Sequence, residues 1–250
     1  MRIVMKIGGS VLTDVSGTPP WVVELRNFLE AGHEVAIVHG GGPAISQSLE
    51  KAQVPVQFYQ GQRVTSPEVL RHVVRILRGE INASLVNTLN RHGLNAVGLS
   101  GIDGTFMTAE HLPPYDLGSV GTVIMVDSQF VEMFWSHGMI PVIAPLASTR
   151  DHAEILNCNA DGVAQGVAAT IAADLLIFYT VTGGLRMNPE DDADVVRELS
   201  RHQIEQWIRT GRATGGMIPK LQAAWGALEH GVSEVLIGSF YGNEPATRIF

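Results

Sequence analysis

Two lysines in this sequence lie beside glycine-rich turns, a setting that suits the transfer of a phosphoryl group. Lys6 interrupts an otherwise apolar run and precedes the pair Gly8–Gly9, and Lys220 ends the segment Gly215-Gly216-Met217-Ile218-Pro219-Lys220. Two fixed cations can stabilise the negative charge that spreads over the non-bridging oxygens during the transfer. From position alone, Lys6 can equally face solvent at a strand end, and Lys220 can be a solvated helix residue.

One acidic and one basic residue are further candidates for a polar site. Asp161 follows Asn157 and Asn159, directly before a run of small residues that predicts a helix. Asp161 could cap that helix, or its carboxylate could hold the two lysines in place and keep them charged. Arg63 precedes the helix start Ser66–Glu68. A lone arginine is usually a surface residue, although its planar guanidinium is the preferred partner of a carboxylate.

Two glycine clusters follow apolar runs. They are Gly8–Gly9 after residues 3–7, and Gly40-Gly41-Gly42 after residues 35–38. Backbone N–H groups without side-chain shielding can face an anion, and the N-terminus of a following helix favours negative charge. One cluster alone would indicate only a tight turn. Two clusters after two strands favour an anion site at the carboxyl edge of a sheet.

The known nucleotide and esterase motifs do not fit. The chain lacks Gly-x4-Gly-Lys-Ser/Thr and therefore a P-loop, and it lacks the dinucleotide motif Gly-x-Gly-x-x-Gly after a strand. The run from His39 to Gly42 is similar to an esterase oxyanion loop, but the Gly-x-Ser-x-Gly elbow that such an enzyme needs is missing.

Strands and helices must alternate to position these residues. Apolar runs predict strands at 3–7, 35–38, 96–99, 139–144, 174–179 and 235–237. Helical spacing predicts helices at 21–29, 44–49, 69–77, 161–172 and 221–228, the first of them stopped by Gly32. Pro141 makes the pairing of its strand less secure. The alternation predicts a mainly parallel α/β sheet with helices on both faces.

Composition limits the class of protein. The 250 residues fit one large domain or two lobes, at about 150 residues per domain. The net charge of -8 argues against nucleic acid as a partner, but a small anionic substrate needs only a local basic pocket. One cysteine excludes a disulfide framework and suits a reducing compartment. Apolar runs fall short of a membrane span, and a secretory layout is missing, so we expect a soluble, cytoplasmic protein without a membrane partner.

The acidic pair Asp191–Asp192 is the other feature that could suggest a metal site. It lies in the polar stretch 187–194. Turn-forming and charged residues in such a stretch are typical of a surface loop. We therefore predict no metal site built from protein ligands.

Taken together, these segments resemble the amino acid kinase superfamily, and within it the N-acetylglutamate kinases. The matching segments occur in the family's order and extend over nearly the whole chain: Lys6–Ser10, His39–Pro43, Arg63–Thr65, Val97–Gly101, Asp103–Gly104, Asp116–Gly121, Asn157–Asp161 and Gly215–Lys220.

The resemblance implies a three-layer αβα sandwich around a central, mostly parallel sheet of about eight strands. It implies one kinase domain over 1–250, with an acceptor-binding lobe at about 1–170 and a nucleotide-binding lobe at about 171–250. The implied reaction uses ATP and Mg²⁺ to phosphorylate the γ-carboxylate of N-acetyl-L-glutamate, giving an acyl phosphate for arginine biosynthesis. The first strand begins at the start of the chain, where arginine-inhibited members carry an extra helix, so we expect an arginine-insensitive homodimer.

The resemblance also implies residue roles. Lys6 and Lys220 resemble the lysines on the transferring phosphoryl group, and Asp161 the carboxylate that organises them. The other implied contacts are Gly8, Gly9, Thr214 and Met217 for the nucleotide, and Gly41, Gly42, Arg63 and Asn157 for the acceptor. A general base is not needed, because a carboxylate acceptor is already ionised at pH 7.

The sequence departs from the family in three places. Val181 replaces the usual aspartate of the nucleotide site, the stretch Gly238–Ala246 is short, and Gly79–Ala83 lacks a common lysine. Two alternatives follow. One is a related kinase acting on carrier-linked aminoadipate or glutamate, which Arg63-Val64-Thr65 disfavours. The other is a non-catalytic binding protein on the kinase fold, which the presence of Lys6, Asp161 and Lys220 argues against.

Overall fold

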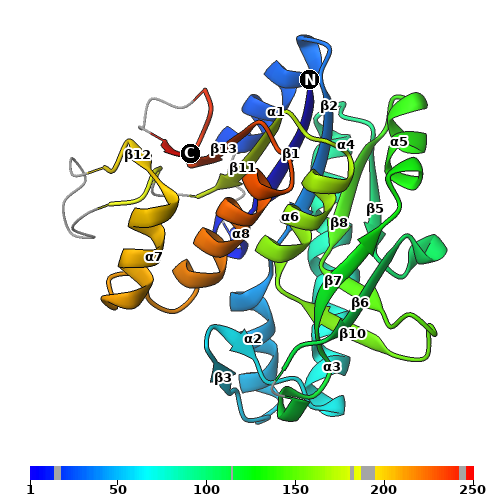
Figure 1. Cartoon of the computed structure of the whole chain (residues 1–250). Helices are drawn as coiled ribbons and strands as arrows, with labels where there is room; N and C mark the ends of the chain where they lie inside the picture. Colours follow the sequence, from blue (N-terminus) through cyan, green and yellow to red (C-terminus); the bar gives the residue numbers. More distant parts are fainter. Residues whose placement is uncertain (14–17, 114, 181–182, 187–194, 242–245) are drawn as a thin grey trace.

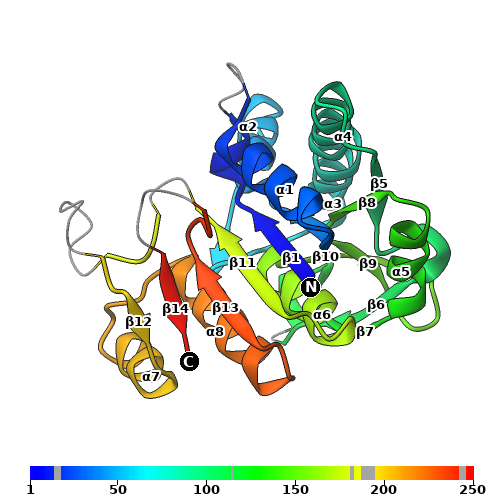
Figure 2. The same cartoon turned by 90° about the horizontal axis from the view of Figure 1, so that it is seen from above.

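An eight-stranded sheet lies between two layers of helices (Figures 1 and 2). The computed structural model describes residues 1–13, 18–113, 115–180, 183–186, 195–241 and 246–250. The strand order is β12-β14-β13-β11-β1-β2-β8-β5. The predicted three-layer αβα sandwich is confirmed.

The central strands run parallel to one another. The parallel set is β5 (Ala96–Ser100), β8 (Ile140–Ala144), β2 (Glu34–His39), β1 (Arg2–Ile7), β11 (Leu175–Tyr179) and β13 (Glu234–Ile237). At one edge, β14 (Thr247–Ile249) runs antiparallel to β13 and parallel to β12 (Glu198–Leu199). The expectation that Pro141 weakens its strand was wrong, because β8 pairs on both sides. Its pairing with β2 begins only at Val142, one residue after the proline.

Alternating side chains give the sheet two apolar faces. Ile3, Met5 and Ile7 of β1 belong to the core cluster on the face that α1 (Pro20–Glu30) and α4 (Asn82–Arg91) cover. Val4 packs on the opposite face, against α6 (Ala160–Thr170) and α8 (Met217–Glu229). Lys6, two residues after Val4, therefore belongs to the α6 and α8 side.

The helices α5 (Ser128–Ser136) and α7 (Arg201–Arg209) pack in the same core as α6 and α8. The helices α2 (Gly42–Lys51) and α3 (Pro67–Val74) pack on each other in a separate apolar cluster. The predicted helix 69–77 is regular only to Val74, since Arg75–Ile81 forms a π-helical segment, η2, that continues into α4. Short 3₁₀ turns are η1 (Gly9–Thr13), η3 (Asp103–Thr105) and η4 (Tyr115–Leu117).

A second, smaller sheet and a hairpin were not predicted. The small sheet contains β10 (Ile155–Cys158), β7 (Val120–Val126), β6 (Met107–His111) and β9 (Leu146–Ser148). The hairpin joins β3 (Phe58–Tyr59) and β4 (Gln62–Arg63). Figure 1 shows both below the main sheet, beside the N-terminal ends of α6 and α8. Each helix among the described residues is too short or too polar to span a lipid bilayer.

Candidate active site

A buried ion pair lies at the carboxyl edge of β1. The Nζ atom of Lys6 is 2.8 Å from Oδ1 of Asp161, which lies in the first turn of α6. The two residues are 8% and 6% exposed. Buried charges of this kind require a partner, and Lys6 is therefore held toward the protein interior rather than turned to solvent.

The side chain of Asp161 is not the cap of α6. Asn159 is the N-cap, and its Oδ1 accepts a hydrogen bond of 2.8 Å from the backbone N–H of Asp161. The capping alternative for Asp161 was therefore wrong, because the amide two residues earlier satisfies the helix end. The carboxylate of Asp161 stays available to Lys6, in a turn where the helix dipole favours negative charge.

Lys220 joins this pair from the first turn of α8. Burial lowers the pKa of Lys220 from its usual value, Asp161 raises it, and Lys6 lowers it further. The three groups therefore sense one another, and they carry one net positive charge when both lysines are protonated. A cluster with this excess charge suits an anion.

The two glycine clusters touch backbone to backbone beside this cluster. A Cβ atom on Gly9 would lie 3.1 Å from the backbone nitrogen of Gly41, and one on Gly40 would lie 3.1 Å from that of Gly9. The turn after β1 therefore packs on the turn after β2, and α2 begins directly at Gly42. Side chains at Gly9 and Gly40 would separate the two turns.

Arg63 is buried at the end of the hairpin, and its surroundings fix the guanidinium. Its Nη2 donates to the carbonyl oxygen of Gly42 at 3.1 Å and to Oγ of Ser46 at 2.8 Å. The ring of Phe58 lies over the guanidinium, with 4.7 Å between the ring centroid and Cζ. Burial lowers the pKa of Arg63, but an arginine remains charged in a protein.

One donor group of Arg63 lacks a partner among the described residues. Its Nη1 atom is buried and makes no hydrogen bond there. A buried unpaired donor costs free energy, and on a charged group this cost is relieved best by an anionic ligand. The alternative of a surface arginine was wrong, because the side chain is buried against Gly42, Ser46 and Phe58.

Asn157 is positioned by a residue that the sequence reasoning did not single out. Nδ2 of Asn157 donates to Oγ1 of Thr65 at 3.1 Å, and that hydroxyl donates to the carbonyl oxygen of Arg63 at 2.8 Å. Thr65 is fully buried. The spacing of Arg63 and Thr65 was visible in the sequence, but the contact with Asn157 depends on the fold.

A cavity of about 200 Å³ gathers most of the candidate residues. Its lining includes Lys6, Gly9, Gly41, Gly42, Arg63, Asn157 and Asp161. Gly8, Lys220, Thr214 and Met217 are not among the lining residues. Thr214 and Met217 lie where α8 begins, with the Met217 N–H bonded to the Thr214 carbonyl at 3.0 Å.

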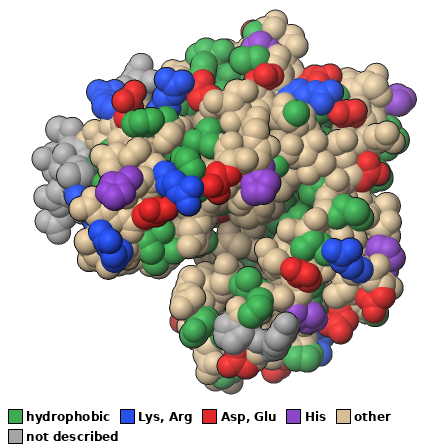
Figure 3. Space-filling view, in the orientation of Figure 1, with side chains coloured by type: hydrophobic (Ala, Val, Ile, Leu, Met, Phe, Trp, Pro, Cys, Tyr) green, Lys and Arg blue, Asp and Glu red, His purple; other side chains and the backbone are tan. Residues whose placement is uncertain are grey.

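The hairpin reaches the turn before α8. A Cβ atom on Gly61 would lie 3.1 Å from the carbonyl oxygen of Gly215. The β3–β4 turn and the Gly215 turn are therefore close to each other, and Gly61 also lines the cavity. Figure 3 shows this face of the molecule hollowed between α8 and the hairpin.

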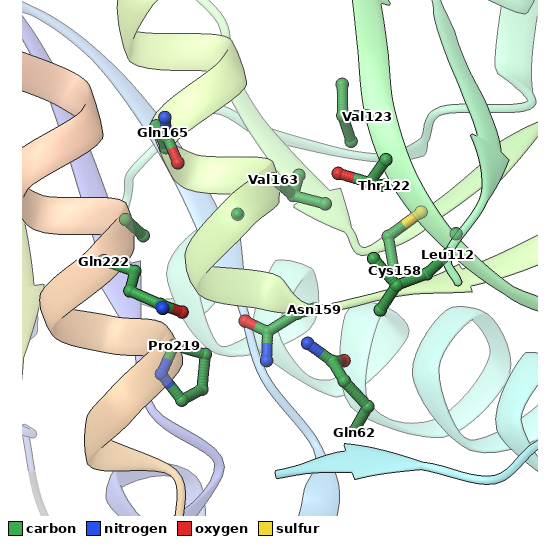
Figure 4. Close-up of a pocket in the computed structure, with 13 residues that line it drawn as sticks. Gln62, Leu112, Thr122, Val123, Cys158, Asn159, Val163, Gln165, Pro219 and Gln222 are labelled. Atoms are coloured by element: carbon green, nitrogen blue, oxygen red, sulfur yellow. The ribbon is translucent and has the colours of Figure 1, made fainter. Parts of the chain in front are cut away.

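A second cavity of about 170 Å³ adjoins the first between α6, α8 and β7 (Figure 4). Gln62, Cys158 and Asn159 line both cavities. The residues that line the second cavity are all uncharged: Gln62, Leu112, Gly121, Thr122, Val123, Cys158, Asn159, Gly162, Val163, Gln165, Pro219, Gln222 and Ala223. The charges that would attract an anion therefore belong to the first cavity.

Three sequence observations fall wholly or partly outside the described residues. They are Val181, the stretch that contains Asp191–Asp192, and the short stretch Gly238–Ala246, of which residues 242–245 are not described. Searched over the remaining parts of the chain, the structure holds no group of three or more His, Cys, Asp or Glu side chains that could bind a metal.

The sequence is similar to named proteins of other organisms over almost its full length. The sequence profile of the amino acid kinase family matches residues 1–239. The acetylglutamate kinase of Geobacillus stearothermophilus is 43% identical over 246 residues, covering 96% of this chain and 92% of the relative. That of Bacillus licheniformis is 42% identical over 241 residues, covering 96% and 91%.

Solved structures agree with the fold. A Streptococcus mutans crystal structure superimposes with a TM-score of 0.89 at 33% identity, covering 98% of both chains. An N-acetylglutamate synthase from Neisseria gonorrhoeae, complexed with coenzyme A and N-acetylglutamate, gives a TM-score of 0.82 at 19% identity. It covers 99% of this chain and 59% of that one, and at this identity the likeness concerns the fold alone.

Proposed function

This chain belongs to the amino acid kinase family, and we propose that it phosphorylates the γ-carboxylate of N-acetyl-L-glutamate with ATP. The observation that carries this proposal is the similarity to acetylglutamate kinases, at about 40% identity over nearly the full chain. The enzyme class is a phosphotransferase with a carboxyl group as acceptor.

In this proposal, Lys6 and Lys220 bind the phosphoryl group during transfer. Both ammonium groups interact with Asp161, which holds Lys6 at 2.8 Å and favours the protonated form of Lys220. Preorganised charges stabilise a transition state without reorganising when the charge develops. Gly8 and Gly9 would add backbone N–H donors to the phosphate oxygens.

Acceptor recognition is assigned to the other side of the first cavity. The free Nη1 of Arg63 suits a substrate carboxylate, while Gly41, Gly42 and Asn157 offer uncharged polar contacts. Arg63 has limited freedom, because Gly42, Ser46 and Phe58 hold it from three sides. Such preorganisation reduces the entropy lost on binding and favours a defined orientation of the acceptor.

The family assignment supports ATP and Mg²⁺ as the cofactors. Thr214 and Met217 would border the nucleotide beside Lys220. Asp161 is the carboxylate among the residues that line the first cavity, and it already pairs with Lys6. The residues therefore fit a magnesium ion held mainly by phosphate oxygens and water. When bound, the ion would neutralise charge between the phosphates.

The lobes and the cellular setting remain part of this proposal. We assign acceptor binding to about 1–170 and nucleotide binding to about 171–250, within one continuous sheet. A place in arginine biosynthesis, a cytoplasmic location and a homodimeric state accompany the kinase assignment. The single cysteine supports a reducing compartment.

The test is ADP release with ATP and magnesium, comparing N-acetyl-L-glutamate, L-glutamate and a blank without acceptor. We expect turnover only with the acetylated acceptor. Turnover that instead needs a carrier-linked acceptor would contradict the substrate assignment. Binding of ATP without turnover on either acceptor would contradict the catalytic assignment and favour a binding protein.

A further inference from the structure

Two buried polar residues lie behind the second glycine cluster, and the proposed function has not used them. His39 ends β2, directly before Gly40, and Asn82 begins α4. Both side chains are 0% exposed. Nδ1 of His39 lies 3.0 Å from the carbonyl oxygen of Gly40, and its Nε2 lies 3.1 Å from Nδ2 of Asn82.

These contacts define which ring nitrogen of His39 carries the proton. A carbonyl oxygen can only accept, so Nδ1 must donate to Gly40. Nε2 is then unprotonated in the neutral ring and accepts from Asn82. Burial lowers the pKa of His39 to about 4, with a smaller lowering from Arg78, although the Gly40 contact raises it. A protonated ring would also place a second N–H against the Asn82 amide.

Asn82 is held in one orientation by its other partners. Its Nδ2 also donates to the carbonyl oxygen of Val142 at 2.9 Å, and its Oδ1 accepts from Nη1 of Arg78 at 3.0 Å. If the amide of Asn82 were flipped, its oxygen would face the carbonyl oxygen of Val142, and its NH₂ group would face the guanidinium of Arg78. Neither pair could form a hydrogen bond. The orientation therefore links β2, β8 and η2 through a single side chain.

The π-helical segment η2 completes this support. A Cβ atom on Gly41 would lie 2.6 Å from both Cδ1 of Ile81 and Cδ2 of Leu77. The η2 side chains therefore pack directly against the backbone of the glycine turn. A π-helical turn changes which residues face the sheet, and here it ends at Ile81, immediately before Asn82.

We propose that His39, held by Asn82, is a positioning residue that sets the conformation of the Gly40–Gly42 turn for acceptor binding. The carbonyl oxygen of Gly40 is fixed by His39, and that of Gly42 accepts from Arg63. A shift of this turn would therefore displace both the turn's backbone donors and the guanidinium. This inference rests on the proposed function, because the turn is assigned to the acceptor.

Two substitutions separate the two contacts of His39. The amide nitrogen of Asn occupies a position close to Nδ1, whereas the amide of Gln reaches the position of Nε2. His39→Asn can therefore keep the bond to Gly40, and His39→Gln can keep only the contact with Asn82. We expect His39→Gln to raise the KM of the acceptor about tenfold, the usual effect of one lost hydrogen bond. The KM of ATP should stay within about twofold, and His39→Asn should restore most of the loss.

Leu89→Ala is the matched control for stability. Leu89 is a fully buried residue of α4 that packs in the cluster on the α1 side. The substitution Leu89→Ala should destabilise α4, the helix that begins with Asn82, and it leaves the contacts of the Gly40–Gly42 turn in place. Loss of acceptor affinity in Leu89→Ala equal to that in His39→Gln would overturn the proposal, as would an equal rise of both KM values in His39→Gln.

A readout without turnover separates this inference from the proposed function. In ¹⁵N NMR spectra of the whole protein, the His39 signals, assigned by their loss in His39→Gln, should show the Nδ1–H tautomer. The amide signals of Gly41 and Gly42 should move in His39→Gln and stay near their wild-type positions in His39→Asn. An Nε2–H tautomer, or unmoved amides in His39→Gln, would contradict the positioning role even if the enzyme is active.

Discussion

Asp161 neutralises the charge of Lys6, with which it forms an ion pair. The charge of Lys220 is therefore the net positive charge of the cluster. The chain has three lysines, Lys6, Lys51 and Lys220. Lys6 forms an ion pair with Asp161, and the charge of Asp161 raises the pKa of Lys220. Desolvation lowers the pKa of Lys220, so the ammonium form is less stable in the free protein than in water. An anion bound beside it would reverse this effect, which couples protonation of Lys220 to phosphate binding.

The first prediction concerns Lys220 and pH. Because its pKa is lowered, the ammonium form should disappear at a lower pH than the usual 10.5, and kcat/KM for ATP should fall there. Lys220→Ala should lower kcat by about 100-fold or more, the effect of losing one preorganised donor. Lys220→Arg should show no alkaline decline. Lys51→Ala is the control and should keep full activity, since Lys51 is exposed at the end of α2. Full activity of Lys220→Ala would exclude Lys220 from the mechanism.

The second prediction concerns Arg63 and its unpaired Nη1. Arg63→Ala should raise the KM of the acceptor by about 10- to 100-fold, as expected for a charged hydrogen bond, and leave that of ATP nearly unchanged. Arg63→Lys should recover little, because a lysine cannot reproduce the planar fork. Arg75→Ala, an exposed residue on η2, serves as the control. Equal effects of Arg63→Ala on both KM values would argue against the acceptor contact.

At the scale of elements, the site is built where strands end and helices begin. The turn after β1 leads into η1, the turn after β2 into α2, and β10 into α6. The sequence indicated these junctions through short apolar runs followed by glycine or asparagine. It left the cap of α6 open, because Asn159 and Asp161 are both good capping residues and only the fold decides between them.

Other elements left no readable signal. The π-helical turns of η2 follow a regular helical pattern from Val69 to Leu77, so the change of hydrogen bonding depends on tertiary contacts. The strands of the small sheet are less uniformly apolar, as Met107–His111 illustrates with MTAEH. The burial of Arg63 likewise depends on a two-residue strand, β4, which is too short for a sequence pattern.

The third prediction concerns the turn that supports Thr65. Gly118 has φ +73, and a Cβ atom there would lie 2.3 Å from the carbonyl oxygen of Thr65. Gly138 has φ +65 with nothing within 4 Å. Gly138→Ala should therefore lower the free energy of unfolding by about 1–2 kcal/mol, from backbone strain alone. Gly118→Ala should lower the free energy of unfolding, measured with urea, by at least about 2 kcal/mol more than Gly138→Ala does. An equal loss of stability in the two variants would show that the clash with Thr65 is relieved.

At the scale of the molecule, one sheet carries both halves of the site. The N-terminal strand β1 pairs with β2 on one side and with β11 on the other, so Lys6 lies between the two proposed lobes. The alternation of predicted strands and helices along the chain indicated a parallel sheet. The strands were apolar at nearly every position, which indicated that helices cover both faces of the sheet. The antiparallel edge was not predicted, since β12 and β14 are only two and three residues long.

The fourth prediction uses the only cysteine of the chain as a probe of the whole fold. Cys158 is 5% exposed, and burial raises the pKa of its thiol to about 12. The thiolate is the reactive form, so the native protein should resist thiol reagents at pH 8. Denaturing urea should make one thiol per chain react. Rapid labelling of the native protein would show that β10 opens locally or is misplaced.

The most direct test of the central claim detects the product itself. An acyl phosphate reacts with hydroxylamine, so incubation with ATP, magnesium, N-acetyl-L-glutamate and hydroxylamine should yield the γ-hydroxamate, identified by mass spectrometry. We predict that this product needs ATP and the acetylated acceptor, and that its rate of formation falls by about 100-fold or more in Lys220→Ala. ADP formation without the hydroxamate, or a hydroxamate formed equally well from L-glutamate, would contradict the account.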